Sequence, residues 1–163
     1  MKSEICTLYR KTRSSGLTAG RDTRIVIGAL IFLVFRNHGL PRTEREVVSA
    51  IVRRYKLNES KVTKNLRRTA KLLARRFNLA LRRVSAEEYV ARFGTSFRLS
   101  QFEMKTACEL YSKLPPRMRF RSPRLVAAAV LYLASGKNRK LTLERLSDEL
   151  GVGLGSLSLM VKS

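Results

Sequence analysis

The chain has 163 residues, of which 44% are hydrophobic, enough for one large domain or two small ones with a real core, and this composition excludes global disorder. Its 34 lysines and arginines outnumber its 12 acidic residues, and the net charge of +22 favours a polyanionic partner, nucleic acid before an anionic membrane. The apolar run 25–35 is shorter than the about 20 residues that a membrane-spanning helix needs, so we expect no membrane role.

Helices are expected throughout, because no segment alternates apolar and polar residues for long. In the first half they cover about residues 3–13, 21–35, 44–54 and 59–77. The third begins after a capping box of Thr43 and Glu46, and the fourth begins at Asn58 or Glu59. The sequence therefore predicts an all-α fold.

The second half continues this pattern. Ser85 resembles a capped helix start, and further helices are expected over about 101–114, 121–135, 142–150 and 154–162. In the second of these four, Ser122 occupies the cap position and Pro123 the first turn. Residues 125–135 contain no lysine or arginine and are apolar on every side, which predicts a buried central helix.

An internal repeat relates the two apolar helices. With an offset of 100 residues, the segment 21–35 aligns with the segment 121–135, including an Arg-x-x-Arg before each helix. This predicts a duplication with a unit of roughly 90–100 residues. The identical pairs are Arg21 and Arg121, Arg24 and Arg124, Val26 and Val126, Ala29 and Ala129, and Leu33 and Leu133.

The helix expected over 59–77 has one basic side and one apolar side. Lysines and arginines share one narrow stripe, and apolar side chains lie opposite. Like charges at this spacing repel, and a merely solvated helix would intersperse glutamate, so phosphate binding is favoured over a solvated face. The stripe consists of Lys61, Lys64, Arg68, Lys71 and Arg75; the apolar side has Val62, Leu66, Ala70, Leu73 and Phe77.

No enzyme, metal site or cofactor is expected. His38 lies in an Asn-His-Gly turn without a positioned partner, and no phosphate-binding glycine loop of the Walker kind occurs. Cys6 and Cys108 form no CxxC pattern and are expected to be reduced, and buried or half-buried. We expect a location in the cytoplasm at the nucleoid, or in the nucleus if the source is eukaryotic.

Several motifs resemble the cyclin-like repeats of archaeal transcription factor B and eukaryotic transcription factor IIB. YRKTRSSGLTAGR (9–21) and LPRTEREVV (40–48) are similar to the first repeat. EYVARFGTSFRLS (88–100), RSPRLVAAAVLYLAS (121–135) and LTLERLSDELGV (141–152) are similar to the second. The resemblance implies two five-helix repeats, here 1–82 and 83–163, that bind TATA-binding protein on promoter DNA. It also implies that the second repeat ends in a helix-turn-helix-like pair that reads an upstream element.

The chain departs from that family in three places. The first repeat lacks its opening helix, because the segment 3–13 matches the second helix of the family's repeat. The zinc ribbon that docks on RNA polymerase is absent, which favours a regulator or competitor of initiation. In the last helix only Ser156, Ser158 and Lys162 reach a base edge or phosphate, and its glycines weaken it, so a packing role is favoured over base reading.

These features together predict a transcription-initiation-factor-like protein that binds duplex DNA with TATA-binding protein, with RNA polymerase as a further candidate partner. A cyclin-like protein-interaction module and a basic structural RNA-binding protein are the alternatives. The expected nucleic-acid-binding residues are Arg21, Arg24, Lys61, Lys64, Arg67, Arg68, Lys71, Arg75, Arg121, Arg124, Ser156, Ser158 and Lys162.

Overall fold

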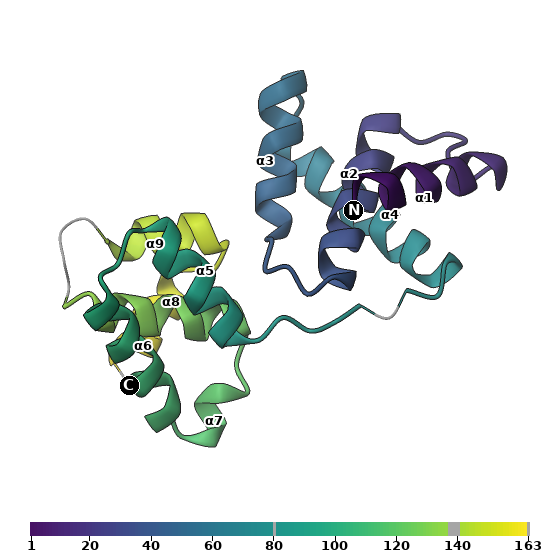
Figure 1. The fold of residues 1–163 in the computed structure, drawn as a ribbon. Coiled ribbons are helices and arrows are strands. Elements are labelled where there is room, and N and C mark those ends of the chain that lie inside the picture. Colours follow the sequence, from purple (N-terminus) through teal and green to yellow (C-terminus); the bar gives the residue numbers. More distant parts are fainter. Residues whose placement is uncertain (80, 137–140, 163) are drawn as a thin grey trace. The chain divides into compact units, whose positions relative to one another are not determined.

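A computed structural model describes residues 1–79, 81–136 and 141–162 and is drawn as a ribbon in Figure 1. Within these residues the chain forms ten α-helices and no β-strand, which confirms the all-α prediction. The helices group into two compact units, residues 1–83 and 84–163, and each is described by itself. None of the helices in this part of the chain is long and apolar enough to cross a bilayer.

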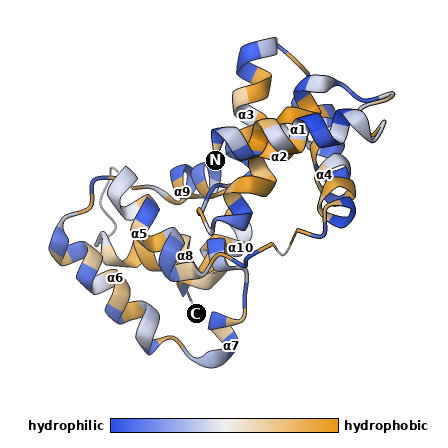
Figure 2. Ribbon diagram, turned by 45° about the vertical axis from the view of Figure 1, so that its right-hand side comes forward, coloured by the Kyte–Doolittle hydropathy of each residue, from blue (hydrophilic) through white to orange (hydrophobic). Residues whose placement is uncertain are grey.

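The first unit is built around α2 (Thr23–Asn37), which packs against α1 (Lys2–Ser14), α3 (Glu44–Tyr55) and α4 (Glu59–Arg76). Val26, Ala29 and Leu30 of α2 are fully buried. Figure 2, coloured by hydropathy, shows α2 mostly in the hydrophobic colour. The apolar run therefore forms the core of this unit, because every neighbouring helix buries its own apolar side against it.

Short-range capping fixes where α3 and α4 begin. Thr43 Oγ1 accepts from the Glu46 backbone N–H at 3.2 Å, and the Thr43 backbone N–H donates to Glu46 Oε2 at 2.6 Å. Asn58 Oδ1 accepts from the Lys61 backbone N–H at 3.0 Å. The predicted capping box and the predicted start of α4 are both confirmed.

Replacing Thr43 by alanine should lower the free energy of unfolding by about 1 kcal/mol, because the substitution removes one acceptor of the capping box at a buried position. Urea unfolding measures the change. Thr7→Ala is the control, since its hydroxyl only donates to the exposed Ser3 carbonyl within α1. Equal stability of the two variants would contradict a role for the cap.

The second unit is built around α8 (Pro123–Ala134). It packs against α5 (Ala86–Ser96), α6 (Gln101–Lys113), α7 (Pro116–Arg119), α9 (Leu143–Leu150) and α10 (Leu154–Lys162). Every residue from Leu125 to Leu131 is buried, which confirms the predicted central helix. After this run Tyr132 is half-buried, and Leu133 has 37% of its surface exposed.

Three details differ from the sequence-based expectations. The helix α7 was not expected; Pro115 and Pro116 do end α6, but Pro116 also suits the first turn of a new helix. Ser122 occupies the cap position of α8 without a side-chain cap hydrogen bond. Cys6 and Cys108 are exposed, so the prediction of burial is wrong: neither cysteine lies on the apolar side of its helix.

The four helices of the first unit correspond in order to α6, α8, α9 and α10 of the second unit, which also contains α5 and α7. The central helices begin at Thr23 and Pro123, and each is followed by a helix capped by a threonine, Thr43 in one unit and Thr142 in the other. The last helix of the first unit is the 18-residue α4, and the last helix of the second is the nine-residue α10. The two helices thus hold equivalent places in the order but differ in length and charge.

Candidate nucleic-acid interface

The solvent side of α4 carries a row of cations, here named the basic stripe: Lys61, Lys64, Arg68, Lys71 and Arg75. All five side chains are exposed, and none forms an ion pair with another residue that the structure describes. Val62, Leu66 and Leu73 on the opposite side are buried against the rest of the unit. Burial thus fixes the rotation of α4, and the basic stripe must face solvent.

Repulsion within the basic stripe works against the stability of α4. Its members alternate at spacings of three and four residues, so each successive pair is a like-charged neighbour on the helix surface. Four such pairs cost about 1–2 kcal/mol together. The only acid in α4 is Glu59 in its first turn, before the stripe begins. The repulsion within the basic stripe lowers the stability of α4, and no ion pair among the described residues of the unit compensates for it. Such an arrangement favours an anion as the ligand of this surface.

The dimensions of the basic stripe fit duplex DNA. From Lys61 to Arg75 the helix rises about 21 Å, since an α-helix rises about 1.5 Å per residue. Duplex DNA places one phosphate per strand every ~3.4 Å along its axis, so this length faces about six base pairs. Five cations over that distance have the sign that a phosphate backbone requires and the reach to contact several of its phosphates.

A polar pocket joins the basic stripe to the loop before α2. It has a volume of about 220 Å³ and is lined by Ala19, Gly20, Arg21, Asp22, Ile25, Asn65, Arg68 and Thr69. Arg21 is held there, because its Nη1 donates to the carbonyls of Leu17 at 2.8 Å and Ala19 at 3.2 Å. The fold therefore brings the predicted residues Arg21 and Arg68 to one pocket.

Asn65 is a member of this pocket that the sequence analysis missed. It lies four residues after Lys61 and three before Arg68, which places it on the flank of the basic stripe. Its amide donates hydrogen bonds that a phosphate oxygen accepts. The spacing of Asn65 from Lys61 and Arg68 was the signal in the sequence that could have identified it as a neighbour of the basic stripe.

Two predicted cations of the first unit are engaged with acids. Arg24 Nη2 lies 2.6 Å from Asp22 Oδ2, and its guanidinium lies 5.1 Å from the centre of the Tyr55 ring. The hydrogen bond from the Arg24 side chain lowers the pKa of the Asp22 carboxyl, outweighing desolvation, which acts in the opposite direction. Arg67 Nε lies 2.7 Å from Glu44 Oε1 and links α4 to α3. These contacts leave both arginines with less charge to offer a phosphate than the basic stripe.

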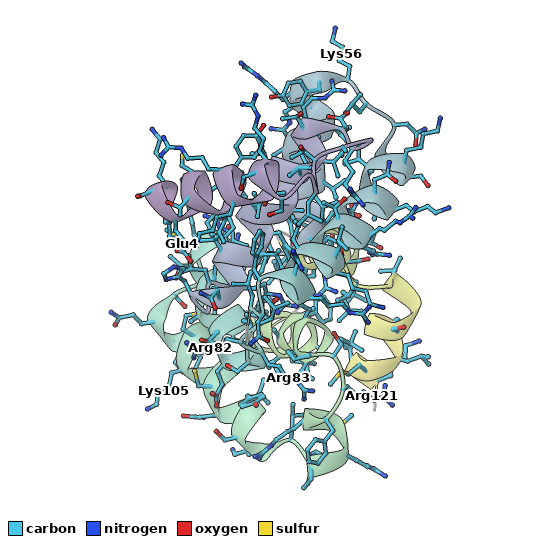
Figure 3. All side chains as sticks on the ribbon, turned by 90° about the vertical axis from the view of Figure 1, so that its right-hand side faces the viewer. Glu4, Lys56, Arg82, Arg83, Lys105 and Arg121 are labelled. Carbon is cyan, nitrogen blue, oxygen red and sulfur yellow. The ribbon has the colours of Figure 1, made fainter. Side chains whose placement is uncertain are left out.

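In the second unit, Arg121 and Arg124 are the counterparts of Arg21 and Arg24 in the internal repeat, and they differ in exposure. Arg124 is half-buried, and its Nη1 donates to the Leu150 carbonyl at 3.3 Å, which joins the start of α8 to the end of α9. Arg121, labelled in Figure 3, is exposed in the turn before α8. Arg124 thus supports the packing of this unit, and Arg121 remains open to a ligand.

A tight turn joins α9 to α10. Gly151 ends α9 with a φ of 63°, in the left-handed region that favours glycine, and Ser147 Oγ donates to the Val152 carbonyl at 2.6 Å. Two helices joined in this way are typical of a helix-turn-helix. The expected pair is therefore present in the second unit.

The outer side of α10 is poor in groups that read bases. Ser156 and Lys162 are exposed and Ser158 is half-buried, while Leu157 and Met160 point into the core. The most exposed large hydrophobic side chain of α10 is that of Leu159, at 69% exposure. A Cβ added to Gly155 would have no atom within 4 Å, so packing does not require glycine there. This surface offers two hydroxyls and one amine, whereas direct readout relies on arginine, lysine, asparagine or glutamine, of which only Lys162 is exposed on this helix.

His38 acts as a link between helices. Its Nε2 lies 2.6 Å from Glu4 Oε2 and joins the end of α2 to α1. No group of three or more His, Cys, Asp or Glu side chains that would hold a metal ion occurs among the described residues. This contact assigns His38 a structural role beyond the turn that the sequence indicates.

Comparison with known proteins gives a consistent set of relatives. The chain is 33% identical over 138 residues to "Transcription initiation factor IIB 2" of Thermococcus kodakarensis, covering 83% of the chain and 42% of that protein. It is 31% identical to the transcription initiation factor IIB of Archaeoglobus fulgidus, covering 83% and 40% respectively. For the protein of the same name from Ignicoccus hospitalis the identity is 27%, over 93% of the chain and 46% of the relative.

The chain therefore spans less than half the length of these relatives. No protein-family model matches it. Because 138 residues exceed the length of either unit, the similarity extends over both units and bears out the resemblance that the motifs indicate.

Proposed function

We propose that this chain, a homologue of the archaeal transcription initiation factors IIB with a core like theirs, binds promoter DNA in transcription initiation. The observation that carries the proposal is the basic stripe: five exposed cations on one side of α4 that no acid among the described residues neutralises. In this proposal the stripe contacts the phosphate backbone, and Arg21 extends the contact through the pocket that it shares with Arg68.

TATA-binding protein is the proposed protein partner on that DNA, because it is the partner that the resemblance to the family implies. The proposal divides the work between two components. Phosphate contacts by this chain supply affinity that depends on salt, and TATA-binding protein supplies the position on the promoter. RNA polymerase is the proposed next partner of the assembled complex.

An electrophoretic mobility shift tests the proposal. Increasing amounts of the chain are added to a labelled duplex with a TATA element, with and without an archaeal TATA-binding protein. We expect binding of the duplex alone at low salt, and a slower, more salt-resistant complex when TATA-binding protein is present. The absence of any shift at low salt would contradict duplex binding, and an unchanged complex on adding TATA-binding protein would contradict that partner.

The two alternative functions give different results in the same assay. An RNA-binding protein would release the labelled duplex DNA more readily to RNA than to unlabelled duplex DNA of the same length. A cyclin-like module that binds a kinase or scaffold has no need of a net charge of +22. The charge is therefore the observation that favours DNA over a purely protein partner.

Sequence discrimination upstream of the TATA element should be small. The outer side of α10 presents Ser156, Ser158 and Lys162, and direct readout by suitable side chains gives about 1–3 kcal/mol per base pair. Scrambling the upstream element while keeping the TATA sequence should change affinity less than about tenfold in a competition assay. A larger loss that disappears in the double variant Ser156→Ala and Ser158→Ala would mean that α10 does read bases.

A further inference from the structure

Phe120 is the most exposed large hydrophobic side chain among the residues described, at 89% exposure. It lies between the end of α7 and the start of α8, and no aromatic or cation–π contact is formed by its ring. Packing in the second unit does not use it. A single exposed apolar side chain is ordinary on a protein surface. Phe120 differs because its ring belongs to a stretch of the chain in which every charged residue is basic.

The segment that carries Phe120 is held in place by its neighbours. Pro115 and Pro116 restrict the backbone on one side, and Pro123 restricts it on the other. Arg119 Nε donates to the Leu114 carbonyl at 2.8 Å, Arg119 also donates to the Ser112 carbonyl, and its guanidinium lies 5.7 Å from the centre of the Tyr111 ring. The ring is thus presented from a fixed support, which lowers the entropy lost when a ligand binds it.

The surroundings of Phe120 are entirely basic in sequence. No acidic residue occurs between Glu109 and Glu144, and Arg117 and Arg121, three residues before and one residue after Phe120 in the chain, are exposed. Neither arginine forms an ion pair with any residue that the structure describes. A ligand that fits this surface has a flat apolar face and negative charge on both sides of it, which is the chemistry of a nucleotide within a strand.

We propose that Phe120 is a stacking platform for an unpaired base of single-stranded DNA, with Arg117 and Arg121 binding the flanking phosphates. This is a second nucleic-acid surface, and it does not depend on duplex binding by the basic stripe. An unpaired base is favoured over a paired one because a single ring must first separate two stacked base pairs to enter a duplex. That separation costs at least as much free energy as one stacking contact returns, whereas an unpaired base accepts the ring without it.

Tryptophan fluorescence provides a direct test, because the chain contains no tryptophan. Phe120→Trp places the only tryptophan of the chain on the proposed platform, where it is excited selectively over the five tyrosines. Phe102→Trp is the matched control, on α6 of the same unit, where the native side chain is 78% exposed. Titration with oligothymidylate should quench the fluorescence of Phe120→Trp and leave that of Phe102→Trp nearly unchanged. Equal quenching of both variants, or of neither, would overturn the proposal.

Affinity measurements separate stacking from other uses of the ring. Phe120→Ala should weaken binding of single-stranded DNA by roughly tenfold and leave duplex binding within about twofold. Phe120→Leu should lose as much as Phe120→Ala, since it keeps an apolar side chain without a ring. Retained affinity in Phe120→Leu, or an equal loss on duplex DNA, would identify an apolar wedge and overturn the stacking proposal. Quenching of Phe120→Trp by an acidic polypeptide but not by oligothymidylate would identify a protein surface instead.

Failure of base stacking at Phe120 and failure of duplex binding by the basic stripe give different experimental results. Substitutions in the basic stripe should reduce duplex binding without altering the quenching of Phe120→Trp. Because Phe120 is exposed, its replacement should leave the thermal unfolding of the chain unchanged, so that weaker single-strand binding cannot be ascribed to loss of folding.

Discussion

Replacing both Lys64 and Arg68 by alanine should lower the affinity for every DNA duplex by a similar factor. Each phosphate contact contributes about 0.9 to the slope of log K against log salt, so two lost contacts reduce that slope by about 1.8. At about 0.1 M salt this corresponds to a loss of roughly 60-fold. The effect should not depend on sequence, because phosphates carry no base information.

The measurement is fluorescence anisotropy with two unrelated duplexes over a series of salt concentrations. The control is the double variant Lys2→Ala and Arg10→Ala, which removes the same charge from exposed positions of α1 in the same unit. That control should change the slope far less, because the lost charges lie on another helix. An unchanged slope in the Lys64 and Arg68 variant would show that the basic stripe is only a solvated face of α4.

Replacing Ala128 by leucine should destabilise the second unit by about 1–3 kcal/mol or more. Ala128 has no exposed surface and lies in the middle of a buried run on α8, a helix that packs against every other helix of its unit. The three additional carbons have no free space to enter, so neighbouring helices must move apart or adopt unfavourable rotamers.

Ala91→Leu is the matched control, since it makes the same substitution at an exposed position of α5. Thermal unfolding followed by circular dichroism should show a midpoint lowered by roughly 5 °C or more for Ala128→Leu and almost unchanged for Ala91→Leu. A midpoint equal to that of the native chain in both variants would mean that this side of α8 has room that the structure does not show.

A larger side chain on the central helix of the first unit should also cause overpacking, but with a smaller loss of stability. Gly28 of α2 occupies the place of Ala128 at the offset of 100 residues, and a Cβ there would lie 2.5 Å from Ile51 Cδ1 of α3. The contact is to the end of a flexible side chain, so part of the strain is relieved by movement of Ile51. The absence of a side chain at Gly28 thus permits close approach of α3.

The features that the sequence alone determined depend on neighbouring residues or on helical periodicity. The starts of α3, α4 and α9 follow from side chains that cap backbone groups three residues away, at Thr43, Asn58 and Thr142. The basic stripe follows from the 3.6-residue period, because burial of Leu66 and Leu73 leaves only one direction for Lys64 and Arg68. Such interactions need no knowledge of distant residues.

The partners of individual charges were decided by the tertiary structure. Nothing near Arg124 in sequence indicates that it binds the Leu150 carbonyl, and nothing near Arg67 indicates Glu44. The pocket shared by Arg21 and Arg68 likewise depends on how the loop before α2 lies against α4. The exposure of Cys108 and of Phe120 was likewise decided by the tertiary structure. The sequence shows how many cations the chain has and how they are spaced. Packing determines which of them bind carbonyls and carboxylates and which remain available to a phosphate, because the hydrogen bonds and ion pairs join residues that only folding brings together.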